Sequence, residues 1–79
     1  MNNEEFKTRE QLYQRLLPAL RVKKKEMHHM KMYSITEIDI WNYFCLNVWN
    51  RKSALTLGEM VNDILNTDNY VILSSRRSN

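Results

Sequence analysis

Two adjacent histidines are the first candidates for a chemical function in this chain, because histidine binds metal ions and transfers protons. His28 and His29 could bind a metal ion, but neighbouring helical residues point about 100° apart, whereas paired histidine ligands on a helix are usually spaced at i and i+4. Solvated or partner-contacting histidines are the better interpretation. We therefore expect no metal site and no cofactor.

Cys45 and the carboxylates of Glu59 and Asp63 are the remaining catalytic candidates. A nucleophilic cysteine needs a low pKa and a nearby base, yet tryptophan and valine flank Cys45 on its expected helix face, so it is interpreted as a packing residue. Glu59 and Asp63 stand four residues apart, but they are more typical of capping and solvent exposure than of a general acid and base. Gly58 is the only glycine, which excludes phosphate loops of the Walker or dinucleotide type. We expect that the protein is not an enzyme.

The segment RVKKKEMHHMKMY, residues 21–33, concentrates positive charge. Residues 1–33 hold eight lysines and arginines against four glutamates, a net charge of +4, while the rest of the chain is close to neutral. Such cations can contact phosphates, and each contact adds salt-sensitive affinity because counterions are released. The alternative is a solvated helix surface that keeps the protein soluble. The candidate RNA contacts are Arg21, Lys23, Lys24, Lys25, His28 and Lys31.

Hydrophobic spacing predicts an all-α fold, a small bundle of three to four helices. Leu12, Leu16 and Leu20 share one helical face, which indicates a helical region over about residues 4–30. Pro18 lies inside it and costs roughly 3 kcal/mol in a helix interior, because it removes a donor and clashes with the preceding turn. We therefore expect two helices here, with Pro18 in the first turn of the second.

The sequence YSITEIDIW marks the start of the next helix. Ser34 with Glu37, or Thr36 with Asp39, has the three-residue spacing that satisfies free N–H groups at a helix start. Apolar residues follow on two adjacent sides, so we expect this helix to be central in the bundle. They are Ile38, Trp41, Cys45, Val48 and Trp49 on one side, and Ile40, Tyr43 and Phe44 on its flank.

A further helix start lies at TLGE, where Thr56 can cap and Glu59 can reach back. The character of the chain changes after Asn66, because NTDN is typical of a turn and YVIL, residues 70–73, is rich in β-branched and aromatic side chains. We expect a short strand or a short extended C-terminal arm there, packed on the helices. The prediction is one helical domain over residues 1–73, followed by a disordered tail over residues 74–79.

A chain of 79 residues makes one domain at most and buries only about 60% of the surface of its unfolded state. Self-association could add stability, so a homodimer is one expected partner. A single cysteine cannot form an internal disulfide, and the N-terminus does not resemble a signal peptide. We therefore expect a cytoplasmic protein. Membrane insertion is not expected, because no apolar run approaches the roughly 20 residues needed to span a bilayer.

Several short motifs follow one another in an informative order. KKKEM ends a helix, Tyr33 precedes the capped turn SITE, Trp41 lies early in the next helix, and WNRK is followed by LTLGEMVNDILN. This order resembles the small post-transcriptional regulators of Gram-positive bacteria typified by ComN. The resemblance spans about residues 12–70. Its most specific part is the pair of tryptophans followed by the last of these motifs.

The resemblance implies a non-enzymatic cytoplasmic regulator that affects the accumulation or localisation of messenger RNA, including transcripts for DNA-uptake competence. It also implies association with a coiled-coil scaffold at the division site and cell pole. Two positions depart from the family pattern. Met32 stands where a glycine is expected before the aromatic, and a larger aromatic is expected near Met27.

Two hypotheses for how such a protein acts follow from the residues. In the first, the cationic segment contacts RNA directly. In the second, an exposed aromatic docks on a helical scaffold and the lysines only aid solubility, since aromatic residues dominate interface hot spots. A helix-turn-helix DNA-binding protein is disfavoured, because no polar recognition helix is evident. The candidate partner contacts are Tyr43, Phe44, Trp49 and Tyr70, with core packing as the alternative for each.

Overall fold

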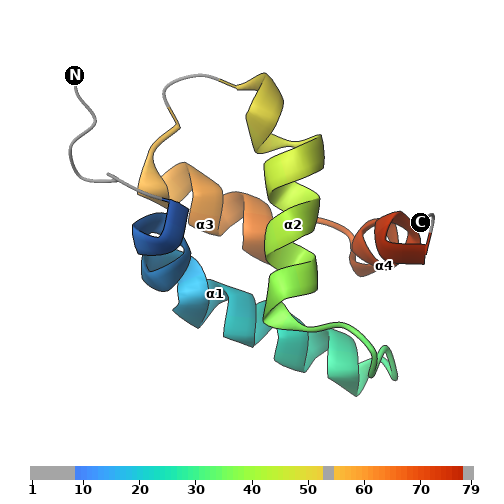
Figure 1. Ribbon diagram of the computed structural model, residues 1–79. Helices are drawn as coiled ribbons and strands as arrows, with labels where there is room; N and C mark the ends of the chain where they lie inside the picture. The colour runs from blue at the N-terminus through green and yellow to red at the C-terminus, as the bar shows by residue number, and fades with distance from the viewer. Residues whose placement is uncertain (1–8, 53–54, 78–79) are drawn as a thin grey trace.

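A computed structural model describes residues 9–52 and 55–77 of the chain. Its elements are α1 (Arg9–His29), α2 (Glu37–Asn47), the 3-10 helix η2 (Trp49–Arg51), α3 (Leu57–Asn66) and α4 (Asn69–Arg77). α1 packs against both α2 and α3, and α4 packs against α2, with α2 running across α1 (Figure 1). Within the described ranges no strand is present, and the predicted all-α bundle is confirmed.

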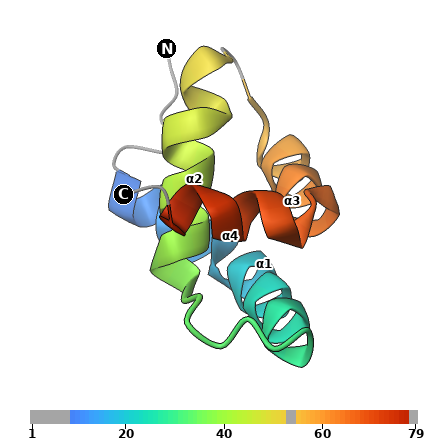
Figure 2. The same ribbon diagram turned by 90° about the vertical axis from the view of Figure 1, so that its right-hand side faces the viewer.

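α1 continues through Pro18, so the prediction of two helices in this region was wrong. Leu16 and Leu20 on either side of the proline are fully buried, and burying each is worth about 1.5–3 kcal/mol, which offsets the roughly 3 kcal/mol cost of the proline. Gln14 and Pro18 are exposed, so water can solvate the Gln14 carbonyl that loses its hydrogen bond. Figures 1 and 2 show the first turns of α1 inclined to the rest, so the helix bends at this point rather than ending. The predicted start at Glu4 lies outside the described residues.

The turn after α1 has a left-handed residue, Lys31, whose φ is 68°. The Met32 N–H donates to the Met27 carbonyl at 3.0 Å, and the Lys31 N–H donates to the His28 carbonyl at 2.9 Å. These two bonds form a Schellman motif, and the buried Met27 and Met32 supply its apolar contact. Met27 and Met32, the two positions that depart from the family pattern, therefore lie in the same turn. The left-handed residue of this turn is Lys31, one position before Met32.

α2 and α3 begin at capping pairs predicted from the sequence. The Thr36 Oγ1 accepts the Asp39 N–H at 3.3 Å, and the Asp39 carboxylate accepts the Thr36 N–H at 2.9 Å. Thr56 and Glu59 exchange the same two bonds at 3.1 and 2.9 Å. Each box satisfies free N–H groups of a helix start. For α2, the structure uses the later of the two pairs that the sequence left open.

The core is built from α1, α2, η2, α3 and α4 together. α2 buries Ile40, Trp41 and Phe44 and packs against α1, η2 and α4, while α3 packs mainly on α1. Ile38 is 50% exposed, however, so the buried side of α2 is centred on Phe44 and the prediction that Ile38 faces inward was wrong. The side chains with no exposed surface are Leu16, Leu20, Met27, Ile35, Ile40, Phe44 and Ile64.

Rings from α1, α2 and η2 pack together at the η2 end of α2; we call this group the aromatic cluster. The Trp49 ring stacks on Phe44 with centroids 5.0 Å apart and meets Trp41 edge to face at 6.1 Å. The Trp49 Nε1–H also donates to the Asp63 carboxylate at 3.0 Å, which ties η2 to α3. The members of the cluster are Tyr13, Trp41, Tyr43, Phe44 and Trp49.

Residues 70–73 belong to α4, so the prediction of an extended C-terminal arm was wrong. The Asp68 carboxylate accepts the Tyr70 N–H at 2.9 Å, and the Asp68 carbonyl accepts the Ile72 N–H at 3.4 Å, so Asp68 starts the helix. The side chain of Ile72 is buried in the core with Leu73 packed against it, a helical rather than an alternating pattern. α4 also includes residues 74–77, placed by the sequence in a disordered tail, while residues 78–79 lie outside the described part.

Candidate functional site

The three consecutive lysines of α1 occupy three different environments. The Lys23 side chain is 2% exposed, and its ammonium donates to the Thr67 carbonyl at 2.6 Å. Thr67 is the C-cap of α3, so the positive charge lies at the negative end of that helix. Lys23 therefore belongs to the interior of the fold, and the structure corrects its place among the candidate RNA contacts.

A polar junction surrounds the Lys23 ammonium and joins α1 to the start of α4. The Glu26 carboxylate lies 3.8 Å from the ammonium and accepts the Asn69 Nδ2–H at 2.8 Å. Asn69 is buried, and its Oδ1 has no hydrogen-bond partner among the described residues. We call these residues, Lys23, Glu26, Thr67 and Asn69, the Lys23 junction. The sequence run KKK gives no sign that its first lysine serves this structural role.

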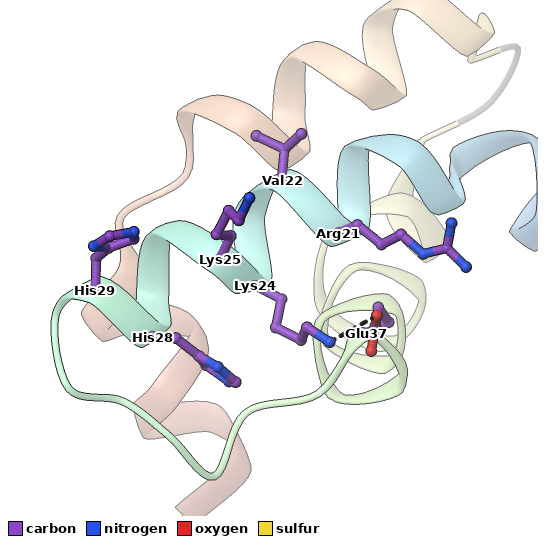
Figure 3. A pocket seen from close by; sticks show the side chains of 7 residues that line it. All are labelled: Arg21, Val22, Lys24, Lys25, His28, His29 and Glu37. Carbon is purple, nitrogen blue, oxygen red and sulfur yellow. Dashed lines mark ion pairs between the residues drawn. The ribbon is translucent and has the colours of Figure 1, made fainter.

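Lys24 is half-buried and forms an ion pair with the first residue of α2. Its ammonium lies 2.9 Å from the Glu37 carboxylate, as the dashed line in Figure 3 shows. The hydrogen bond from Lys24 lowers the pKa of Glu37, and the positive charges of Lys24 and Arg21 act in the same direction. Lys25 is exposed and makes no hydrogen bond or ion pair with any residue the structure describes. Of the three lysines, Lys25 therefore presents at the surface an ammonium that is unpaired among the described residues, and Lys24 presents one that is paired with Glu37.

A shallow depression of about 650 Å³ lies over this side of α1. All but one of its lining residues come from α1, and Glu37 of α2 supplies its single carboxylate (Figure 3). Three of the lining side chains, Arg21, Lys24 and Lys25, carry a fixed positive charge and only Lys24 points at Glu37, so the depression is cationic overall. Its lining residues are Arg21, Val22, Lys24, Lys25, His28, His29 and Glu37.

His28 connects the depression to the turn that follows α1. Because a carbonyl oxygen only accepts, the His28 Nε2–H donates to the Ile35 carbonyl, at 2.9 Å. The His28 ring also meets the Tyr33 ring edge to face, with centroids 6.0 Å apart. His28 therefore lines the candidate surface and fastens the turn at the same time. His29 points to another side of α1 (Figure 3), so the two histidines do not converge.

Two of the candidate partner contacts are core residues. Phe44 and Trp49 are buried in the aromatic cluster, and Tyr43 is half-buried there. Tyr70 on α4 is 59% exposed and is the one member of the predicted set that a partner could reach freely. The sequence interpretation missed Tyr33, whose side chain is 68% exposed. Its position between a helix end and a capping box was the available signal, because such turns lie at the surface.

The residues considered for catalysis have structural roles. Burial raises the pKa of the Cys45 thiol, which disfavours the nucleophilic thiolate. Glu59 belongs to the capping box of α3, and the Asp63 carboxylate accepts from Trp49 and lies 3.6 Å from the Lys52 ammonium. Over residues 9–52 and 55–77, no group of three or more potential metal ligands comes together. None of the helices in these two ranges combines the length and the hydropathy of a membrane-spanning segment.

Fold and surface together define a small all-α protein with a cationic depression on its first helix. Residues 9–74 match the sequence model of the family described as Post-transcriptional regulator, and the chain belongs to that family. Neither the curated proteins nor the solved structures gave a match.

Proposed function

We propose that this family member is a non-enzymatic regulator that binds RNA directly through the cationic depression of α1. The observation that carries the proposal is the placement of Arg21, Lys24 and Lys25, whose spacing makes them neighbours on the helix surface. Arg21 and Lys25 are exposed, so they can contact phosphates without a large desolvation cost. The family description supports RNA as the regulated molecule, and the resemblance to ComN-type regulators favours messenger RNA, including competence transcripts.

The number of available cations sets the expected strength of binding. About three phosphate contacts would give a slope of roughly −2 for log affinity against log salt, since each contact to a single strand contributes about −0.7. Dissociation constants of about 10⁻⁴–10⁻⁶ M are usual for such electrostatic binding at physiological salt. We therefore expect weak binding at physiological salt that tightens strongly as salt is lowered.

The test is a titration of a labelled, unstructured RNA with the purified protein across a salt series. Lys25→Glu should weaken binding and reduce the magnitude of the salt slope by about 0.7, and Arg21→Glu with Lys25→Glu should weaken binding more than tenfold. Arg51→Glu is the matched control, because Arg51 is also exposed but lies on η2, at the far end of α2 from Glu37 (Figure 1). Equal losses in Lys25→Glu and Arg51→Glu, or no binding at low salt, would refute the proposal.

A second candidate function is an adaptor that docks on a coiled-coil scaffold at the division site or pole. It is favoured by one observation: Tyr70 and Val71 are neighbouring exposed side chains on α4. Such an adaptor would lose its scaffold on Tyr70→Ser and keep it on Lys25→Glu. RNA binding that depends on Lys25 would favour the first function over this one.

A further inference from the structure

Tyr33 is a large aromatic residue that the turn between α1 and α2 leaves exposed beside the cationic depression. We infer that Tyr33 stacks against an RNA base and that the RNA ligand of this surface is single-stranded. The inference rests on the proposed function, because it names the form of RNA that the same surface accepts. Single-strand-binding proteins combine cations that follow the phosphates with aromatic rings on which bases stack.

The position of the Tyr33 ring connects it to the cations. His28 lines the depression, and its ring lies edge to face with that of Tyr33 at 6.0 Å. Arg21 and His28 are seven residues apart on α1, which corresponds to roughly 10 Å along the helix. A strand whose phosphates lie on Arg21 and Lys25 can therefore run along α1 past His28 and place a base on Tyr33.

The backbone on both sides of Tyr33 is held in place. Met32 and Ile35 are buried, and Met32 is also fixed by the Schellman bond to Met27. The bond from the His28 Nε2–H to the Ile35 carbonyl closes the turn against α1. Because the turn is anchored before RNA binds, little conformational entropy is lost when a base stacks on the ring.

The preference for single-stranded RNA follows from the geometry of stacking. Bases in a duplex are already stacked and paired, whereas bases of a single strand are free to lie on an aromatic side chain. Stacking accepts any base, since every base has a π face. We therefore expect a preference for single strands over duplexes, and weak dependence on sequence.

Tyr70 provides a matched control for Tyr33. It is exposed to a similar extent, 59% against 68%, but it lies on α4 and does not line the cationic depression. The Asp68 carboxylate accepts the backbone N–H of Tyr70 and would repel phosphates there.

The experiment compares Tyr33→Ala, Tyr33→Phe and Tyr70→Ala with the unchanged protein. The probes are fluorescein-labelled oligouridine and the same strand annealed to oligoadenosine. Tyr33→Ala should weaken binding to oligouridine about tenfold, in the range found for loss of one stacked base. Its salt slope should stay unchanged, because stacking releases no counterions, and Tyr33→Phe and Tyr70→Ala should bind like the unchanged protein.

Circular dichroism melting of each variant controls for folding, which a substitution at an exposed ring should not alter. Equal affinity of Tyr33→Ala and Tyr70→Ala, an equal loss in Tyr33→Phe, or equal binding of the duplex would overturn the inference. The proposed function would then stand as long as Lys25→Glu still weakens binding. Failure of the unchanged protein to bind oligouridine at low salt would overturn both.

Discussion

Replacing Lys23 by alanine should destabilise the protein far more than the same change at Lys25. The substitution removes a charged hydrogen bond of 2.6 Å to the Thr67 carbonyl, worth about 1.5–3 kcal/mol. It also removes three buried methylene groups, at about 0.8 kcal/mol each. Part of this loss is offset because the ammonium no longer has to be desolvated. We expect Lys23→Ala to lower the free energy of unfolding by about 2–4 kcal/mol.

That loss is large for a chain of this size. Domains are stable by roughly 0.05–0.15 kcal/mol per residue, which corresponds to about 4–12 kcal/mol here. Lys23→Met should cost less, about 1–3 kcal/mol, because methionine keeps most of the buried stem and loses only the ammonium. Lys23→Glu should unfold the protein, since it would place a second carboxylate beside Glu26 and against the C-terminal end of α3.

Urea denaturation followed by circular dichroism measures these differences. Lys25→Ala is the matched control and should change the free energy of unfolding by no more than about 0.5 kcal/mol, as exposed substitutions usually do. If Lys23→Ala and Lys25→Ala were equally stable within that margin, the assignment of Lys23 to the interior would be refuted. A variant in which all three lysines are replaced by glutamate would not test RNA binding, because the change at Lys23 is expected to unfold the protein.

Two further substitutions test the turn and the ion pair. Lys31→Gly should raise the free energy of unfolding by about 1 kcal/mol, because glycine adopts the observed φ of 68° without the penalty of a side chain; a urea midpoint that does not rise would contradict this. Glu37→Gln should tighten RNA binding several-fold, since it removes the only carboxylate of the depression, and should destabilise the fold by up to about 1 kcal/mol. Folding lowers the pKa of Glu37, so its ion pair stabilises the fold at pH values above the ordinary pKa of 4.5. That stabilisation is lost as the pH falls through the lowered pKa of the folded state. Urea midpoints of Glu37→Gln and the unchanged protein should therefore converge in acid, and a gap that persists there would exclude the ion pair as its cause.

Signals that depend on neighbouring residues were predictable from the sequence. The boxes Thr36–Asp39 and Thr56–Glu59 join residues three apart, so each is specified by its own segment. The prediction that the helical region divides at Pro18 failed because the outcome depends on distant residues. The helix continues through Pro18 because its buried residues pack on helices far away in the sequence. Residues 70–73 were predicted to be extended, but they are also helical because they pack on distant helices. A local signal was missed here as well, because Asp68 caps the start of this helix.

The candidate site was only partly predictable for a geometric reason. The apolar stripe of α1 runs from Leu20 to Met27, and both Lys23 and Lys24 lie at spacings that continue it. Only the position of the Thr67 carbonyl, which depends on how α3 packs, selects Lys23 for burial. The exposure of Tyr33 likewise depends on its buried neighbours in the turn.

The aromatic cluster has a spectroscopic consequence. Both tryptophans lie in it, with Tyr13 5.4 Å from Trp41, so light absorbed by nearby tyrosines passes to the indole rings, and their emission reports on the core where α1, α2 and η2 meet. Tyr33 and Tyr70 lie outside this group of rings. Tryptophan emission should therefore stay constant while a ligand occupies the α1 surface of an unchanged fold. A shift in that emission on adding a ligand would reveal that the helices themselves have moved.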